Sequence, residues 1–151
     1  IFEAANVLVV GFGHTYSSYG GLVAGSNNNV TETYASVSGG SSNTASGPYS
    51  SVSGGNENTA SGYWSSVSGG ALNTATGSSS SSVSGGYNNT ASGLYSSVSG
   101  GKNNVASGDE SSVSGGGSHT ASGLRSSVSG GWNRAAPSDN DWAAGGEFED
   151  F

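Results

Sequence analysis

The chain has 151 residues, a net charge of −7, no cysteine and 28 glycines, and only 32% of its residues are hydrophobic. Such a composition is too poor in apolar residues for a thick globular core, and it excludes disulfides, thiolate catalysis and Cys-ligated metals. The only basic residues are Lys102, Arg125 and Arg134, so nucleic-acid binding is not expected. No apolar run reaches the roughly 18 residues of a membrane-spanning helix, so no membrane span is expected.

Residues 1–10 form the densest apolar stretch of the chain and are expected to form a β-strand. They belong to a degenerate first coil, residues 1–21, which either caps the molecule or docks to another copy. The apolar side chains of this stretch are one half of a hypothetical assembly interface: Ile1, Phe2, Val7, Leu8, Val9 and Val10.

Residues 22–131 repeat two sequence motifs in alternation, Ser-Ser-Val-Ser-Gly-Gly and Asn-Thr-Ala-Ser-Gly. Successive repeat valines lie 14 or 15 residues apart, except for 16 residues between Val67 and Val83, where an extra residue falls in the serine run at residues 78–82. With degenerate units at both ends, ten units are recognised, centred at residues 9, 23, 37, 52, 67, 83, 98, 113, 128 and 143. A fixed short period of this kind predicts a stacked repeat structure with atypical ends.

Each unit contains two short β segments separated by glycine-containing turns, while Gly, Ser, Thr and Asn all disfavour helix. The sequence therefore predicts one all-β domain, a single parallel β-solenoid (β-roll) of about ten two-stranded coils. Alternation along a strand leaves two arrangements open. Either Val and Ala point inward and Ser and Thr outward, or Val forms an exposed apolar stripe that needs a partner. The first is favoured because small interior residues let the two sheets approach closely.

A column of aromatic residues is expected at the outside of one turn. The residue three positions before the repeat valine is aromatic in four units: Tyr34, Tyr49, Trp64 and Tyr95. Stacked aromatic rings would brace neighbouring coils, which is the favoured interpretation. A binding stripe for a ligand is the alternative.

Residues 132–151 are expected to form an acidic and aromatic C-terminal coil and cap. Five of the ten acidic residues lie in residues 139–151, interleaved with Trp142, Phe148 and Phe151, which complete the hypothetical assembly interface. The segment either covers the last coil, where its charges oppose edge-to-edge aggregation, or docks onto residues 1–10 of another copy. Head-to-tail contacts that do not close generate filaments.

The sequence contains few residue patterns that are typical of a catalytic or metal site. Neither His14 nor His119 has a carboxylate spaced to orient it, so both are interpreted as polar residues exposed in turns. No enzyme activity, cofactor or metal is therefore predicted. Two Asn-x-Thr sequons, at Asn29 and Asn88, would accept N-glycans if the chain enters a glycosylating compartment.

The phrase Ser-Val-Ser-Gly-Gly-x-x-Asn-Thr-Ala-Ser-Gly resembles the head repeats of YadA-like trimeric autotransporter adhesins, and related 14–15-residue repeats of bacterial exported proteins, over nearly the whole chain. This resemblance implies a left-handed parallel β-roll. It also implies an extracellular or cell-surface location, a homotrimer and adhesion to matrix.

Three functions fit these features. The favoured one is a non-enzymatic extracellular structural protein that assembles with itself, end to end, into a fibre or surface filament. The first alternative is an adhesin head module that binds matrix or glycans. The second alternative is an ice-binding protein, because flat ladders of Thr, Ser and Ala on a regular solenoid order water, although serine ladders are less rigid than threonine ladders.

Overall fold

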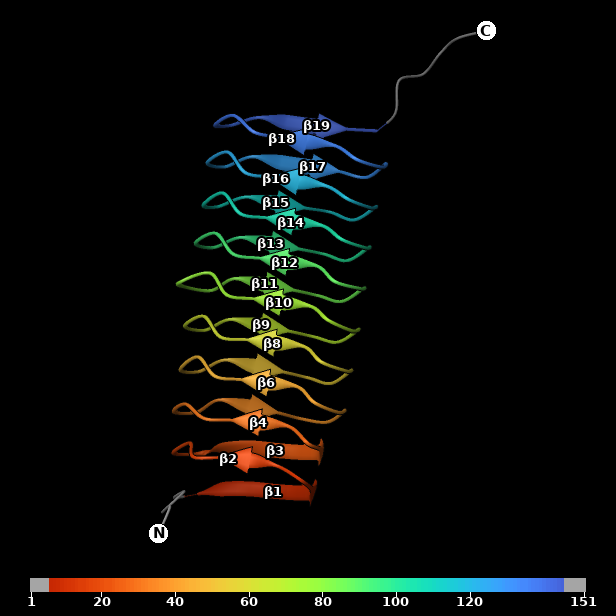
Figure 1. Cartoon of the computed structure of the whole chain (residues 1–151). Helices are drawn as coiled ribbons and strands as arrows, with labels where there is room; N and C mark the ends of the chain where they lie inside the picture. Colours follow the sequence, from red (N-terminus) through yellow and green to blue (C-terminus); the bar gives the residue numbers. More distant parts are fainter. Residues whose placement is uncertain (1–5, 146–151) are drawn as a thin grey trace, which may run out of the picture.

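The computed structural model describes residues 6–145, which form an all-β solenoid of stacked coils (Figure 1). Strands alternate along the chain between two parallel sheets, a ten-stranded sheet A and a nine-stranded sheet B. Sheet A contains β1 (Val7–Phe12), β3 (Gly21–Ser26), β5 (Ser36–Val37), β7 (Ser51–Val52), β9 (Ser66–Val67), β11 (Ser82–Val83), β13 (Ser97–Val98), β15 (Ser112–Val113), β17 (Ser127–Ser129) and β19 (Trp142–Ala144). Sheet B contains β2 (Thr15–Tyr16), β4 (Asn29–Val30), β6 (Thr44–Ala45), β8 (Thr59–Ala60), β10 (Thr74–Ala75), β12 (Thr90–Ala91), β14 (Val105–Ala106), β16 (Thr120–Ala121) and β18 (Ala135–Ala136).

Every strand pairs in parallel with the equivalent strand of the next coil, so the predicted solenoid of about ten coils is confirmed. The 16-residue unit does not break this register, because Val67 still pairs with Val83. The extra residue is absorbed in the bend between β10 and β11, which protrudes farther than the turns of the two neighbouring coils (Figure 1). Equivalent side chains therefore line up in columns along the stack.

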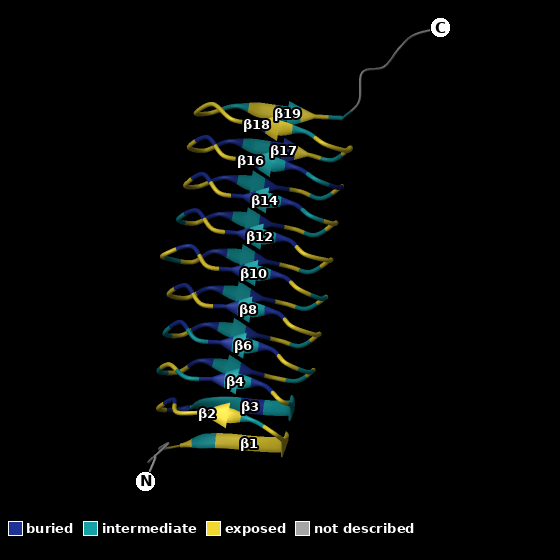
Figure 2. Ribbon diagram, in the orientation of Figure 1, coloured by how far each residue is buried: buried dark blue, intermediate teal, exposed yellow. Residues whose placement is uncertain are grey.

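The repeat valines and alanines point inward, which confirms the favoured arrangement. The core is a thin double column between the two sheets (Figure 2). Its members are 0–1% exposed: Val23, Val30, Val37, Ala45, Val52, Ala60, Val67, Ala75, Val83, Ala91, Val98, Ala106, Val113, Ala121, Val128 and Ala136. Since successive residues of a strand face opposite sides, the hydroxyl residues that flank each Val and Ala point outward.

The first strand differs in its limits from the predicted residues 1–10. β1 begins at Val7, directly after Asn6, which has a left-handed φ of 65°. It continues past Val10 because Gly11, at φ 117°, and Phe12 still pair with β3. The predicted interface residues Ile1, Phe2, Phe148 and Phe151 lie outside the described residues.

A column of buried serines lines the interior beside the turn that precedes sheet A. Its members are Ser50, Ser65, Ser81, Ser96, Ser111 and Ser126, and Ala35 holds the same place one coil earlier. Ser65 donates a hydrogen bond of 2.8 Å to the carbonyl of Gly62. The Ser96 hydroxyl is buried and has no partner among residues 6–145.

Ser96→Ala is therefore expected to leave the free energy of unfolding unchanged or to raise it by about 0.5 kcal/mol, because an unpaired buried hydroxyl is unfavourable. Ser65→Ala removes a real hydrogen bond and is expected to lower it by about 1 kcal/mol. Urea unfolding followed by circular dichroism measures both. Equal losses in the two variants would show that Ser96 is hydrogen-bonded in solution.

Candidate binding faces

The outward side of sheet B presents two parallel ranks of small, uncharged residues, and we call it the threonine face. The rank before each inward residue is mostly threonine: Thr15, Asn29, Thr44, Thr59, Thr74, Thr90, Val105, Thr120 and Ala135. The rank after it is mostly serine: Ser17, Thr31, Ser46, Ser61, Thr76, Ser92, Ser107, Ser122 and Pro137. Nine strands at a spacing of about 4.8 Å make a face about 38 Å long.

The outward side of sheet A presents serines in both ranks through its middle coils, and we call it the serine face. These residues are Ser36, Ser38, Ser51, Ser53, Ser66, Ser68, Ser82, Ser84, Ser97, Ser99, Ser112, Ser114, Ser127 and Ser129. Its two end coils carry apolar residues instead, including Leu8 and Trp142. The two faces are thus similar in spacing but differ in chemistry, because serine lacks the γ-methyl group of threonine.

A ladder of buried asparagines fixes the spacing from coil to coil. Asn58 is typical: its Nδ2 donates to the carbonyls of Gly54 (2.9 Å) and Gly70 (3.0 Å), and its Oδ1 accepts from the backbone N–H of Asn73 at 2.9 Å. The same three bonds recur at Asn28, Asn43, Asn58, Asn73, Asn89 and Asn104. Each asparagine therefore clamps its own turn to the next coil.

The two histidines occupy this ladder. The interpretation as an exposed turn residue was wrong for His119, whereas His14 is partly exposed beside a turn. His119 is fully buried. Its Nδ1 accepts from the backbone N–H of Arg134 at 3.0 Å, and its Nε2 lies 3.0 Å from the carbonyl oxygen of Gly131. His14 likewise accepts from the backbone N–H of Asn28 at 3.2 Å. A neutral imidazole has one acceptor and one donor nitrogen, so it can replace the asparagine amide.

The predicted aromatic column forms a partly stacked ladder on one edge of the solenoid. Tyr34 and Tyr49 stack with ring centroids 5.3 Å apart, and Tyr49 lies 6.0 Å from Trp64. Tyr95 stands apart, because Ser80 interrupts the column. Ring faces that contact each other leave mainly their edges for a ligand, and this geometry favours bracing of neighbouring coils.

Charged side chains lie at the turns. Arg125 forms an exposed ion pair with Glu110 at 3.0 Å. Lys102 lies 5.6 Å from the ring centroid of Tyr87.

Of the two sequons, Asn88 is exposed in a turn and donates to Asn103, whereas Asn29 lies within β4. No outward strand position of either sheet carries a charge within residues 6–145.

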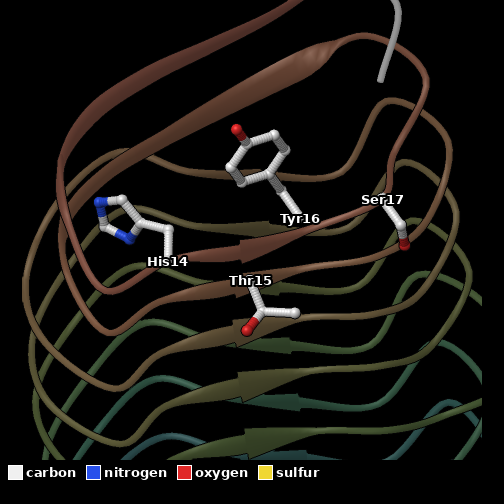
Figure 3. A pocket seen from close by; sticks show the side chains of 4 residues that line it. All are labelled: His14, Thr15, Tyr16 and Ser17. Carbon is white, nitrogen blue, oxygen red and sulfur yellow. The ribbon is translucent and has the colours of Figure 1, made fainter. Parts of the chain in front are cut away.

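The first coil borders an open cavity of about 460 Å³ lined by His14, Thr15, Tyr16 and Ser17. His14 and Tyr16 lie on the inner side of the coil, and Thr15 points away from it (Figure 3). Tyr16 occupies the inward column that holds alanine in most later coils. In the part of the chain that the structure describes, no group of three or more His, Asp or Glu residues could hold a metal ion.

No protein-family model matches the sequence, and no curated protein matches it. The resemblance to YadA-like head repeats therefore stays a prediction from the motif. Across residues 6–145, no helix is long and apolar enough to cross a membrane. A functional proposal rests on the two faces and the two ends of the solenoid.

Proposed function

We propose that this chain binds ice through its threonine face. One observation carries the proposal: threonines occupy equivalent outward positions of neighbouring parallel strands, in register, on a face without charge. Thr44 pairs with Thr59, Thr59 with Thr74, and Thr74 with Thr90. Ice binding makes the fullest use of this surface, because the residues that flank the inward residues of sheet B are mostly threonine and serine.

The spacing of the face suits a repeating lattice. Neighbouring strands lie about 4.8 Å apart, and residues i and i+2 of one strand lie about 6.7 Å apart. The two ranks together form a regular two-dimensional array of hydroxyl and methyl groups. The two spacings of this array are close to the distances between water oxygens in ice layers. Hydroxyl groups hydrogen-bond to water, while methyl groups between them confine the water to the gaps.

Rigidity distinguishes the threonine face from the serine face. The β-branched threonine has a restricted χ1 angle, so its hydroxyl and methyl groups are held in fixed directions. Val105, which replaces threonine in β14, keeps the branched shape and one methyl group in place. A serine hydroxyl rotates more freely, and ordering water on it is less favourable.

A protein partner is a weaker explanation of this face. Protein interfaces depend on buried aromatic and arginine residues, whereas Ser, Thr and Val are under-represented at their energetic centres. The outward positions of sheet B hold mostly Ser and Thr and no aromatic or arginine residue within residues 6–145. Ice binding is also consistent with the proposed extracellular or cell-surface location, where the chain would meet ice.

The test is thermal hysteresis of the purified chain, together with its retention in a slowly grown ice hemisphere. Thr74→Tyr places a bulky ring at the centre of the threonine face and is expected to abolish most of the thermal hysteresis. The reduction follows because one ring holds the face away from the ice on both sides of β10.

The matched control is Ser82→Tyr, which places the same ring at the equivalent position of the serine face, in the same coil. It is expected to keep most of the activity, with both variants folded by circular dichroism. An unmodified chain without hysteresis or retention would overturn the proposal. Binding to immobilised matrix or glycans in that case would favour an adhesin head. Loss of activity only in Ser82→Tyr would assign the wrong face.

A further inference from the structure

The N-terminal end of the solenoid exposes residues of columns that the middle coils bury. Val9 and Tyr16 occupy inward positions, yet they are 39% and 40% exposed, while the valines and alanines of the same columns from β3 to β18 are 0–1% exposed. The cavity of the first coil lies beside Tyr16 (Figure 3). This end therefore presents core surface that a further coil would cover.

Apolar side chains on the serine face gather at the two ends of the stack. Leu8 and Phe12 on β1 are 62% and 70% exposed, and Trp142 on β19 is 67% exposed. The outward residues of the seven strands from β5 to β17 are serines. In a single copy the two apolar groups lie at opposite ends of the rod (Figure 1).

The register of both sheets specifies how a second copy would fit. β1 and β19 are the two edges of sheet A, and β2 and β18 are the two edges of sheet B. If β1 of a second copy follows β19 with the register of the existing pairings, its Leu8 lies opposite Trp142 and its Val9 continues the column of Ala143. The same placement sets its β2 beside β18.

We infer that the chain assembles head to tail, with β19 and β18 of one copy continued by β1 and β2 of the next. Apolar cross-strand pairs stabilise strand pairing, so Leu8 opposite Trp142 favours the joint. Because such a contact does not close on itself, it generates open-ended rods. The inference is independent of ice binding, although a joined rod would present a longer threonine face.

A pair of engineered cysteines reports the register of this joint, because the chain contains no cysteine of its own. Leu8→Cys combined with Trp142→Cys is expected to give a ladder of disulfide-linked multimers under mild oxidation. Directly paired strands lie about 4.8 Å apart, within the range of Cα separations that a disulfide spans. The matched control combines Phe12→Cys with Trp142→Cys, whose Cα atoms would be about 14 Å apart in the joint.

Sedimentation of the unmodified chain over a concentration series completes the test. Masses rising through successive multiples of 14.6 kDa, with crosslinks only in the Leu8 pair, support the joint. Equal crosslinking of the two cysteine pairs would overturn the register. A monomer at every concentration would overturn the proposed assembly. A discrete trimer without larger species would also overturn the head-to-tail rod, because it would show a closed assembly. Thermal hysteresis of a monomer would leave ice binding intact.

Discussion

Gly55→Ala is expected to destabilise the solenoid by about 3 kcal/mol or more, as other changes that force backbone strain inside a packed core do. Gly55 has a φ of 89°, which L-residues rarely adopt. A methyl group there would overlap the carbonyl oxygen of Gly70 in the next coil and lie 2.6 Å from the amide nitrogen of Asn58. Two coils would have to separate, so the midpoint of urea unfolding should fall sharply.

Gly54→Ala is the matched control, one residue earlier in the same turn. A methyl group at Gly54 meets no atom within 4 Å, and its backbone is outside the left-handed region. A change of less than about 1 kcal/mol is expected, since alanine also restricts the unfolded chain. Similar losses in both variants would contradict the close stacking of Gly55 on the next coil.

Asn58→Ala is expected to lower the free energy of unfolding by about 3–5 kcal/mol, because it leaves buried polar groups unpaired at about 1–3 kcal/mol each. The substitution removes the partners of the Gly54 carbonyl and the Asn73 backbone N–H, both held by a side chain that is fully buried. It also removes one of the two donors to the Gly70 carbonyl, which keeps the backbone N–H of Asn56. Thermal and urea unfolding monitored by circular dichroism measure the loss.

Asn56→Ala serves as the comparison for the asparagine ladder. Asn56 is exposed, and its side chain makes a single hydrogen bond of 3.3 Å to the carbonyl of Ser41. A loss within about 0.5 kcal/mol is expected for such a surface position. If Asn58→Ala were equally mild, water would have to replace the amide in the interior, and the ladder would not hold the coils together.

The sequence was sufficient to predict the architecture because the repeat has a strict phase. Val52 and Val67 are 15 residues apart and Ala60 lies midway between them, so one coil must contain two inward positions on opposite sheets. Small interior residues favoured Val and Ala inside, and their burial agrees. The extra residue before Val83 was also placed correctly, because an insertion disturbs a turn less than a paired strand.

Side-chain substitutions within a column were harder to predict. His119 precedes Thr120, Ala121 and Ser122, so it stands where other coils have asparagine. The signal was present in the repeat alignment, but the equivalence of imidazole and amide depends on which ring nitrogen faces which backbone group. The left-handed φ of Tyr49 and Trp64, 59° and 54°, was likewise hidden, since aromatic residues seldom adopt it.

The candidate faces followed from the sequence only as alternatives. Which residues point outward depended on the inward direction of Val and Ala. Threonine and serine then lie on different sheets, because the Asn-Thr-Ala-Ser-Gly motif forms sheet B and the Ser-Ser-Val-Ser-Gly-Gly motif forms sheet A. The exposed Val9 and Tyr16 could not be anticipated, because their exposure depends on what stacks on the first coil.

Each coil hydrogen-bonds only to the coil before it and the coil after it, through the same backbone pairs and the same asparagine clamp. An in-frame duplication or deletion of one whole repeat therefore preserves every contact at the new junction. A gene built this way can change length by unequal recombination without searching for a new core. The width of each face stays constant while its length varies by units of one strand spacing, so natural selection can adjust the reach of the surface independently of its chemistry.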